Sequence, residues 1–255
     1  MEIAVSQFVL FFLIFLRVTA LVVVAPIVGH QAVPVQVKVA LGIFVALVLY
    51  PVVAISNPPV DLSFGSFVVA GAKEVATGLL IGFASGMVIQ GAVVAGELIS
   101  FDLGLSMASV LDPESGMQNT LMSEFLQLVM VMVFLLVNGH HFVLQTLRFS
   151  YEAAPIGGIA LSQPLADRLL SIAGMTLVIG VKIAAPVIVA SFLVNVALAV
   201  LTRVAPQINV FMLNFQLKIG IGYFILLASA PMMVFVFKKL LNGFEENMLE
   251  LVKVL

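Results

Sequence analysis

The stretch 64–95, FGSFVVAGAKEVATGLLIGFASGMVIQGAVVA, decides the class of fold, because it is almost entirely apolar over more than one bilayer crossing. As one straight α-helix it would extend about 50 Å at 1.5 Å per residue, against about 30 Å of bilayer hydrocarbon. The run 169–201 is similarly long. Each run predicts either one bent helix or two packed segments. Pro186 favours a kink or a break in the second run, because proline removes one backbone hydrogen bond.

The composition of the whole chain agrees with this membrane character. Hydrophobic residues make up 62% of the sequence and charged residues only 9%, whereas a soluble domain has roughly 25% charged residues. Most of the apolar runs reach the roughly 20 residues that a spanning helix needs. These runs are 3–25, 39–56, 64–95, 125–137, 169–201 and 208–237. We therefore predict an all-α, polytopic membrane-class protein with about six long apolar helical segments in a single domain, 1–255.

Several classes of function are disfavoured by the sequence. A net charge of -2 gives no basic patch for nucleic acid, and the absence of cysteine excludes a disulfide framework and cysteine-ligated metals. His140 and His141 are adjacent and therefore point in different directions, so a turn after an apolar helix explains them better than a metal site. No catalytic motif is present. We expect no enzyme activity, no cofactor and no metal.

Charged residues inside the apolar runs are the first candidates for a special role. A charge at the centre of a bilayer costs about 2.5 to 3.5 kcal/mol on insertion scales. For any single one of them, snorkelling of a lysine or capping of backbone carbonyls by Arg17 is an alternative, but these alternatives explain all of the charges together less easily. We predict buried charges that serve helix packing, and these are Arg17, Lys73, Glu74, Lys182 and Lys218.

Three glycines form a second pattern. Gly78, Gly82 and Gly86 recur every four residues, so they lie along one stripe of a helix. Small residues at this spacing let two helix backbones approach closely in an apolar environment. The stripe predicts a helix-packing surface and does not identify a function.

The central region is acidic and contains no basic residue. Between Lys73 and Arg148 there is no lysine or arginine, and the part 97–124 contains five carboxylates, at Glu97, Asp102, Asp112, Glu114 and Glu124. The region 97–124 therefore needs water or a protein partner around it. Glu97 and Asp102 have two interpretations: a proton or cation relay, or a structural role in which they accept backbone hydrogen bonds at the base of a loop.

The carboxy-terminal segment 240–255 has an amphipathic pattern. Apolar residues recur there at helical spacing opposite a set of glutamates. The apolar set is Leu240, Leu241, Phe244, Met248, Leu251 and Val252, and the acidic set is Glu245, Glu246 and Glu250. The pattern predicts an amphipathic helix that packs on a surface.

Groups of residues along the whole chain carry a resemblance to a known family. They are Arg17 with Ala25-Pro26, Pro34 and Lys38; Ala95-Gly-Glu-Leu-Ile99 followed by the stretch 104–113; Asn138-Gly-His140; Pro155-Ile-Gly157; and the stretch 203–211. In order and spacing these groups resemble the R subunit of the flagellar protein-export gate, the FliR family, which is similar to the T subunit of type III secretion injectisomes. Departures from the usual pattern are Asp102, where the family usually has Gln, and Asn214 and Gln216, where Gly and Pro are common.

The resemblance implies a non-enzymatic gate component made of long, kinked helical hairpins that stack in a helical ring with partner subunits. The implied partners are the P and Q subunits, FliP and FliQ, together with FlhB and FlhA. Unfolded flagellar proteins would pass through the channel in transit. The implied location is the inner membrane of a bacterium, in the flagellar basal body, where the gate serves flagellum biogenesis by type III secretion.

The family's central loop helps to plug the closed channel, and the resemblance maps this plug onto 106–118. Turn-forming residues and apolar side chains that can repack suit such a loop. The predicted plug residues are Ser106, Met107, Ser109, Leu111, Asp112, Pro113, Ser115, Gly116, Met117 and Gln118, and the predicted loop base is Glu97, Asp102 and Gly104.

Two alternative functions remain open from the sequence. One is a single-chain ion or solute transporter that uses Glu97, Asp102 and Lys182, although no convincing inverted repeat supports it. The other is the equivalent subunit of a virulence injectisome. Overall resemblance favours the flagellar gate.

Overall fold

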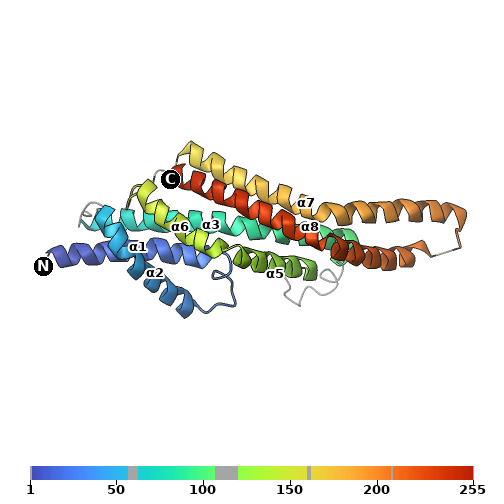
Figure 1. Ribbon diagram of the computed structural model, residues 1–255, viewed down its shortest axis with the longest axis horizontal. Helices are drawn as coiled ribbons and strands as arrows, with labels where there is room; N and C mark the ends of the chain where they lie inside the picture. Colours follow the sequence, from blue (N-terminus) through green and yellow to red (C-terminus); the bar gives the residue numbers. More distant parts are fainter. Residues whose placement is uncertain (1, 57–62, 107–119, 160–161, 208, 255) are drawn as a thin grey trace. The chain divides into compact units, whose positions relative to one another are not determined.

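The structure is a computed structural model that describes residues 2–56, 63–106, 120–159, 162–207 and 209–254. Within these ranges it contains helices and no strands, so the all-α prediction is confirmed (Figure 1). The helices are α1 (Glu2–Val24), α2 (Val35–Ser56), α3 (Phe64–Leu103), α5 (Leu121–Leu136), α6 (Gly139–Ala153), α7 (Gln163–Val204) and α8 (Val210–Val254).

The two longest apolar runs each form one helix. α3 has 40 residues and α7 has 42, so the alternative of two packed segments in each run is wrong. α7 continues through Pro186, as α2 does through Pro51 and α8 through Pro231. A break at Pro186 is therefore not found. The physical reason is that a proline removes a single hydrogen bond of the helix, and the bonds on either side can hold the remaining turns together.

Five of the described helices are long and apolar enough to cross a membrane, or up to six if α5 and α6 together make one span. This agrees with the prediction of about six segments. α5 and α6 are separated by Val137 and Asn138, and Asn138 has a left-handed backbone with φ 60°. Asparagine tolerates this conformation better than most residues. The Asn-Gly pair therefore marks the turn that the sequence predicted there.

The chain forms two compact units. The first unit comprises Met1–Val88, Asn138–Ala173 and Asn242–Leu255, and the second comprises Ile89–Val137 and Gly174–Leu241. Three helices, α3, α7 and α8, contribute residues to both units. The polar clusters described below each lie within one unit.

α1 lies at the centre of the first unit. It packs against α2, against the first part of α3 and against α6. Its Leu13, Ile14 and Val18 side chains are fully buried. Burial of such aliphatic side chains stabilises the unit where it removes them from water. Where it removes them from lipid, the stabilisation comes from tight van der Waals packing between the helices.

The second unit surrounds the last part of α3. Gly91 of α3 lies against Ile179 of α7, and Gly180 of α7 lies against Val94 of α3, so each helix offers a glycine to the other. The approach at Gly180 is close, because a methyl group there would lie 2.9 Å from Val94 Cβ. Such an exchange of small residues permits close packing of two apolar helices.

The segment 240–255 forms the last turns of α8 as far as Val254, and no separate helix begins there. Its Phe244, Met248 and Leu251 side chains are buried, whereas Glu245 and Glu246 are exposed. The Phe244 ring contacts the Phe142 ring of α6 at 6.0 Å between centroids. The amphipathic pattern therefore corresponds to packing of this helix end within the first unit.

Candidate functional site

The first candidate site is a buried ion pair in the first unit. Arg17 of α1 is 0% exposed and meets Glu74 of α3 through two hydrogen bonds, Nε to Oε2 at 2.6 Å and Nη2 to Oε1 at 3.0 Å. The two side chains form a fork-to-fork pair, the strongest arrangement of a guanidinium and a carboxylate. α1 and α3 are thereby joined at one fixed register.

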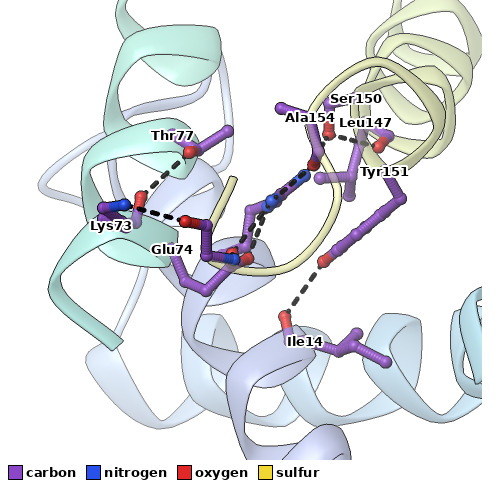
Figure 2. Close-up of polar contacts among 10 residues, drawn as sticks. Ile14, Lys73, Glu74, Thr77, Leu147, Ser150, Tyr151 and Ala154 are labelled. Atoms are coloured by element: carbon purple, nitrogen blue, oxygen red, sulfur yellow. Dashed lines mark hydrogen bonds and ion pairs between the residues drawn. The ribbon is translucent and has the colours of Figure 1, made fainter. Parts of the chain in front are cut away.

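The remaining donors of Arg17 reach the end of α6. Nη1 donates to Ser150 Oγ at 3.1 Å, and Nη2 donates to the Ala154 carbonyl at 3.0 Å. The guanidinium lies 4.2 Å from the centre of the Tyr151 ring, whose hydroxyl donates to the Ile14 carbonyl (Figure 2). A buried charge is tolerated only with such complete pairing, because its desolvation is expensive.

The turn after α6 is held by two adjacent residues of α3. Glu74 Oε1 accepts the Gly157 backbone N–H at 2.9 Å, and Lys73 Nζ donates to the Gly157 carbonyl at 2.9 Å. Gly157 has φ +73°, a conformation that a side chain would strain. Arg17, Lys73 and Glu74 thus fix three segments that are far apart in the sequence.

The glycine stripe of α3 faces α1. A methyl group on Gly78 would overlap the Arg17 carbonyl oxygen, and one on Gly82 would lie 2.8 Å from the Leu21 carbonyl oxygen. Gly86 has more room, with the Val24 carbonyl oxygen at 3.7 Å from such a methyl. The absence of side chains at Gly78 and Gly82 brings the backbones close enough for the ion pair to form.

The other two charges of the apolar runs differ from each other. Lys218 of α8 donates to the Asp102 carbonyl at 3.0 Å, and its Nζ lies 3.8 Å from Asp102 Oδ1. Lys182 is exposed on α7, so the expectation that it is buried within this chain is wrong. Its position on the helix explains this, since Ile183 and Ala184 are the residues that turn towards the packed side.

The second candidate site, in the second unit, is a cluster of side chains that joins α3 to the start of α5. Glu97 Oε1 accepts from Ser123 Oγ at 2.6 Å and from the Thr120 backbone N–H at 3.1 Å. Ser100 Oγ donates to Thr120 Oγ1 at 2.7 Å. We call these four residues the clasp. Gly96 completes the contact, because a methyl group there would overlap the Ser123 backbone.

α3 ends beside this clasp. Gly104 has φ +78°, and the Leu105 N–H returns to the Ser100 carbonyl at 2.9 Å, which is the usual pattern of a glycine-terminated helix. Asp102 lies on the last turn with Oδ2 buried and, among the described residues, without a hydrogen-bond partner. Glu97 therefore accepts a backbone hydrogen bond at the loop base, whereas the carboxylate of Asp102 faces Lys218.

Most of the predicted plug lies outside the described residues. Ser106 is described, and its N–H lies 3.4 Å from the Ser100 carbonyl oxygen. The predicted plug residues between 107 and 119 are not described. The structure therefore gives both ends of the segment and leaves the plug itself as a prediction.

The hydroxyl residues around these charges were not predicted from the sequence. Thr120 and Ser123 bond Glu97, and Ser150 bonds Arg17. Ser100 bonds Thr120, and the Tyr151 ring lies against Arg17. A signal was present in Thr120 and Ser123, since Thr or Ser directly before an apolar helical run is typical of a helix start. Nothing in the sequence spacing joins Ser150 to Arg17, because the contact spans 133 positions.

The fold and these contacts define a class of protein: an all-α membrane protein in which buried Arg17 and Glu74 pair between two helices. The chain belongs to the bacterial export proteins of family 1, because the family described as "Bacterial export proteins, family 1" matches residues 8–244.

Individual relatives match over most of their length. The flagellar biosynthetic protein FliR of Bacillus subtilis (strain 168) is 28% identical over 250 residues, which covers 96% of this chain and 95% of that protein. The FliR proteins of Aquifex aeolicus (strain VF5) and Pectobacterium carotovorum subsp. carotovorum are each 30% identical. These two alignments cover 86% and 83% of this chain, and 84% and 80% of the respective relatives.

Proposed function

We propose that this chain is a structural and gating subunit of the bacterial flagellar protein-export gate. The observation that carries the proposal is the family match over residues 8–244, together with relatives that are named flagellar biosynthetic protein and are aligned nearly end to end. The flagellar cargo is favoured over that of an injectisome because the relatives compared above are flagellar.

The surface of α7 supports a role inside an assembly. Val178, Val181 and Val189 are about half exposed or more, at 51%, 54% and 57%. Lys182 is exposed between them. An exposed ammonium on an apolar helix is unfavourable against lipid tails and acceptable against protein or water. We propose that subunits of the P and Q types, FliP and FliQ, cover such surfaces, with FlhB and FlhA as further partners and the inner membrane at the basal body as the location.

The contacts of the clasp are an observation in favour of the proposed plug. Glu97, Thr120 and Ser123 hold the two ends of the segment together, so a loop between them starts and ends at one place. A loop anchored in this way can rearrange without unfolding the helices that carry it. We propose that the segment 106–118 closes the channel for unfolded flagellar proteins until export begins.

The single-chain transporter is not favoured. Glu97 was its first candidate for a relay, but the carboxylate of Glu97 already accepts hydrogen bonds from Thr120 and Ser123. This structural role accounts for an acidic residue at that position without any transport chemistry.

A clean deletion strain tests the proposed function. We expect flagellar building blocks to disappear from the culture medium and swimming to stop, and both to return when the wild-type gene is supplied on a plasmid. A second complementation with Glu124→Ala, an exposed residue in the first turn of α5, serves as a matched control that should also restore export. Normal export and swimming in the deletion strain would overturn the proposal.

A further inference from the structure

The start of α5 carries an incomplete capping arrangement. Thr120 is the N-cap, with an extended backbone at φ -75° and ψ 156°, and its side chain accepts from the Ser123 N–H. In a complete capping box the residue three positions after the N-cap is Glu or Gln, and its side chain accepts the N-cap N–H in return. Here that residue is Ser123, whose short side chain donates to Glu97.

Glu97 supplies the missing half from another helix. Its Oε1 accepts the Thr120 N–H at 3.1 Å, which is the bond that a glutamate at position 123 would make in a complete box. A carboxylate at this place also faces the positive end of the α5 dipole. Because Glu97 belongs to α3, the first turn of α5 is capped by a residue 23 positions before it.

The same carboxylate also ties the two helices together. Glu97 accepts from Ser123 Oγ at 2.6 Å, and Ser100 of α3 donates to Thr120 Oγ1 at 2.7 Å. Gly96 permits this approach, since any side chain there would meet the Ser123 backbone. The Glu97 carboxylate therefore both caps α5 and tethers it to α3, with Ser100 as a second tether, and none of these contacts persists if α3 and α5 separate.

We propose that Glu97 is a positioning residue that completes the capping box of α5 in trans, so that the first turn of α5 is complete only while α3 and α5 are in contact. Separation of the two helices exposes the Thr120 N–H and loosens that turn, and re-formation of the contact restores both. A role of this contact between α3 and α5 in gating rests on the proposed function, whereas the capping of α5 by Glu97 does not.

Three variants separate capping from tethering. Glu97→Ala removes the cap and the Glu97 tether and leaves the weaker tether of Ser100 to Thr120. Glu97→Ala with Ser123→Glu restores a capping box within α5 but does not restore the Glu97 tether. Glu124→Ala is the matched control, because it removes an exposed carboxylate from the first turn of α5, the turn that Glu97 caps. A fourth variant, Glu97→Gln, keeps an oxygen acceptor without the charge.

Two measurements on the full chain in lipid nanodiscs report the two effects. Amide hydrogen exchange over residues 120–126 reports the first turn of α5. Spin labels on Phe101→Cys and Leu121→Cys report the distance between the helices, and both residues are exposed, at 80% and 73%. The natural chain contains no cysteine, so the labels attach only at these two positions.

We expect Glu97→Ala to accelerate amide exchange about 10-fold, the size of a lost cap, and to broaden the distance distribution. Adding Ser123→Glu should return the exchange to within about threefold of the wild type while the distribution stays broad. Glu124→Ala should leave the distance distribution unchanged and keep the amide exchange within about threefold of the wild type. Unchanged exchange in Glu97→Ala, or a distance restored by Ser123→Glu, would overturn the proposal.

If Glu97→Ala does not accumulate, Glu97→Gln carries the test. We expect it to accelerate exchange about threefold, since a neutral acceptor is weaker than a charged one. Exchange equal to the wild type at every amide of 120–126 would overturn the proposal. Neither measurement involves export. A failure of the proposed capping by Glu97 and a failure of the proposed export-gate function therefore give different results.

Discussion

Breaking the Arg17–Glu74 pair should destabilise the first unit strongly. In Arg17→Met the side chain keeps its apolar length and loses the guanidinium, so its hydrogen bonds to Glu74, Ser150 and the Ala154 carbonyl disappear. Glu74 then keeps the Gly157 N–H but has no counter-ion, while its side chain is 1% exposed. An uncompensated buried carboxylate is the dominant consequence.

The magnitude follows from this burial. Removing one partner of a buried ion pair costs about 3–5 kcal/mol. In the double variant Arg17→Met, Glu74→Leu no buried charge remains, and the loss is limited to the unpaired Gly157 N–H and Ala154 carbonyl, about 1–3 kcal/mol each. The two single variants together should lose about 6–10 kcal/mol and the double variant about 2–6 kcal/mol, so the double variant should lose about 4 kcal/mol less than the sum of the single variants.

Unfolding by sodium dodecyl sulfate in mixed micelles, followed by circular dichroism, measures these free energies. The exposed pair Arg148–Glu152 is the matched control, with side chains 60% and 54% exposed and a 4.0 Å separation. Arg148→Met should cost less than about 1 kcal/mol. Two results would refute this account. One is a loss of less than about 1 kcal/mol in the free energy of unfolding for each single variant at Arg17 and Glu74. The other is a loss in the double variant equal to the sum of the two single losses.

The remaining predictions concern helix packing, the end of α3 and the loop. Gly78→Ala should lower the unfolding midpoint in the same assay because its methyl group would overlap a backbone carbonyl, whereas Gly174→Ala, which meets nothing within 4 Å, should be neutral or stabilising; equal midpoints would contradict the close packing. Lys218→Met should cost about 1–3 kcal/mol because the Asp102 side chain loses the cation that faces it, and an unchanged free energy of unfolding would show that this contact contributes nothing. Replacing 109–119 with a short Gly-Ser linker should leave assembly intact and make the assembled gate leaky to small ions in planar bilayers, while unchanged conductance with normal assembly would count against a plug.

The sequence predicted the fold class well because apolar length is a direct signal. A run that exceeds a bilayer, such as 64–95, predicts a long helix whatever its partners are. The length of such a run does not decide whether it forms one helix or two packed segments, because the same apolar residues satisfy either arrangement. Pro186 was over-interpreted for a similar reason, since proline weakens a helix locally without ending it.

The candidate sites were predicted only in part, because charges are visible in a sequence and their partners are not. Arg17 and Glu74 stood out as ions in apolar runs, but their pairing depends on the glycine-mediated approach of α1 and α3. Lys182 stood out equally and is exposed in this chain. Glu97 was predicted to lie at a loop base, and its contact with the first turn of α5 depends on α3 lying beside Thr120, which the sequence does not show.

Assembly is the most direct test of the central claim that this chain is an export-gate subunit. The tagged chain is co-expressed with subunits of the P and Q types, purified in mild detergent and weighed by native mass spectrometry. We expect a single complex of fixed stoichiometry that contains one copy of this chain with several P and Q subunits. Recovery of the chain alone, or with the partners in variable ratios, would contradict the claim.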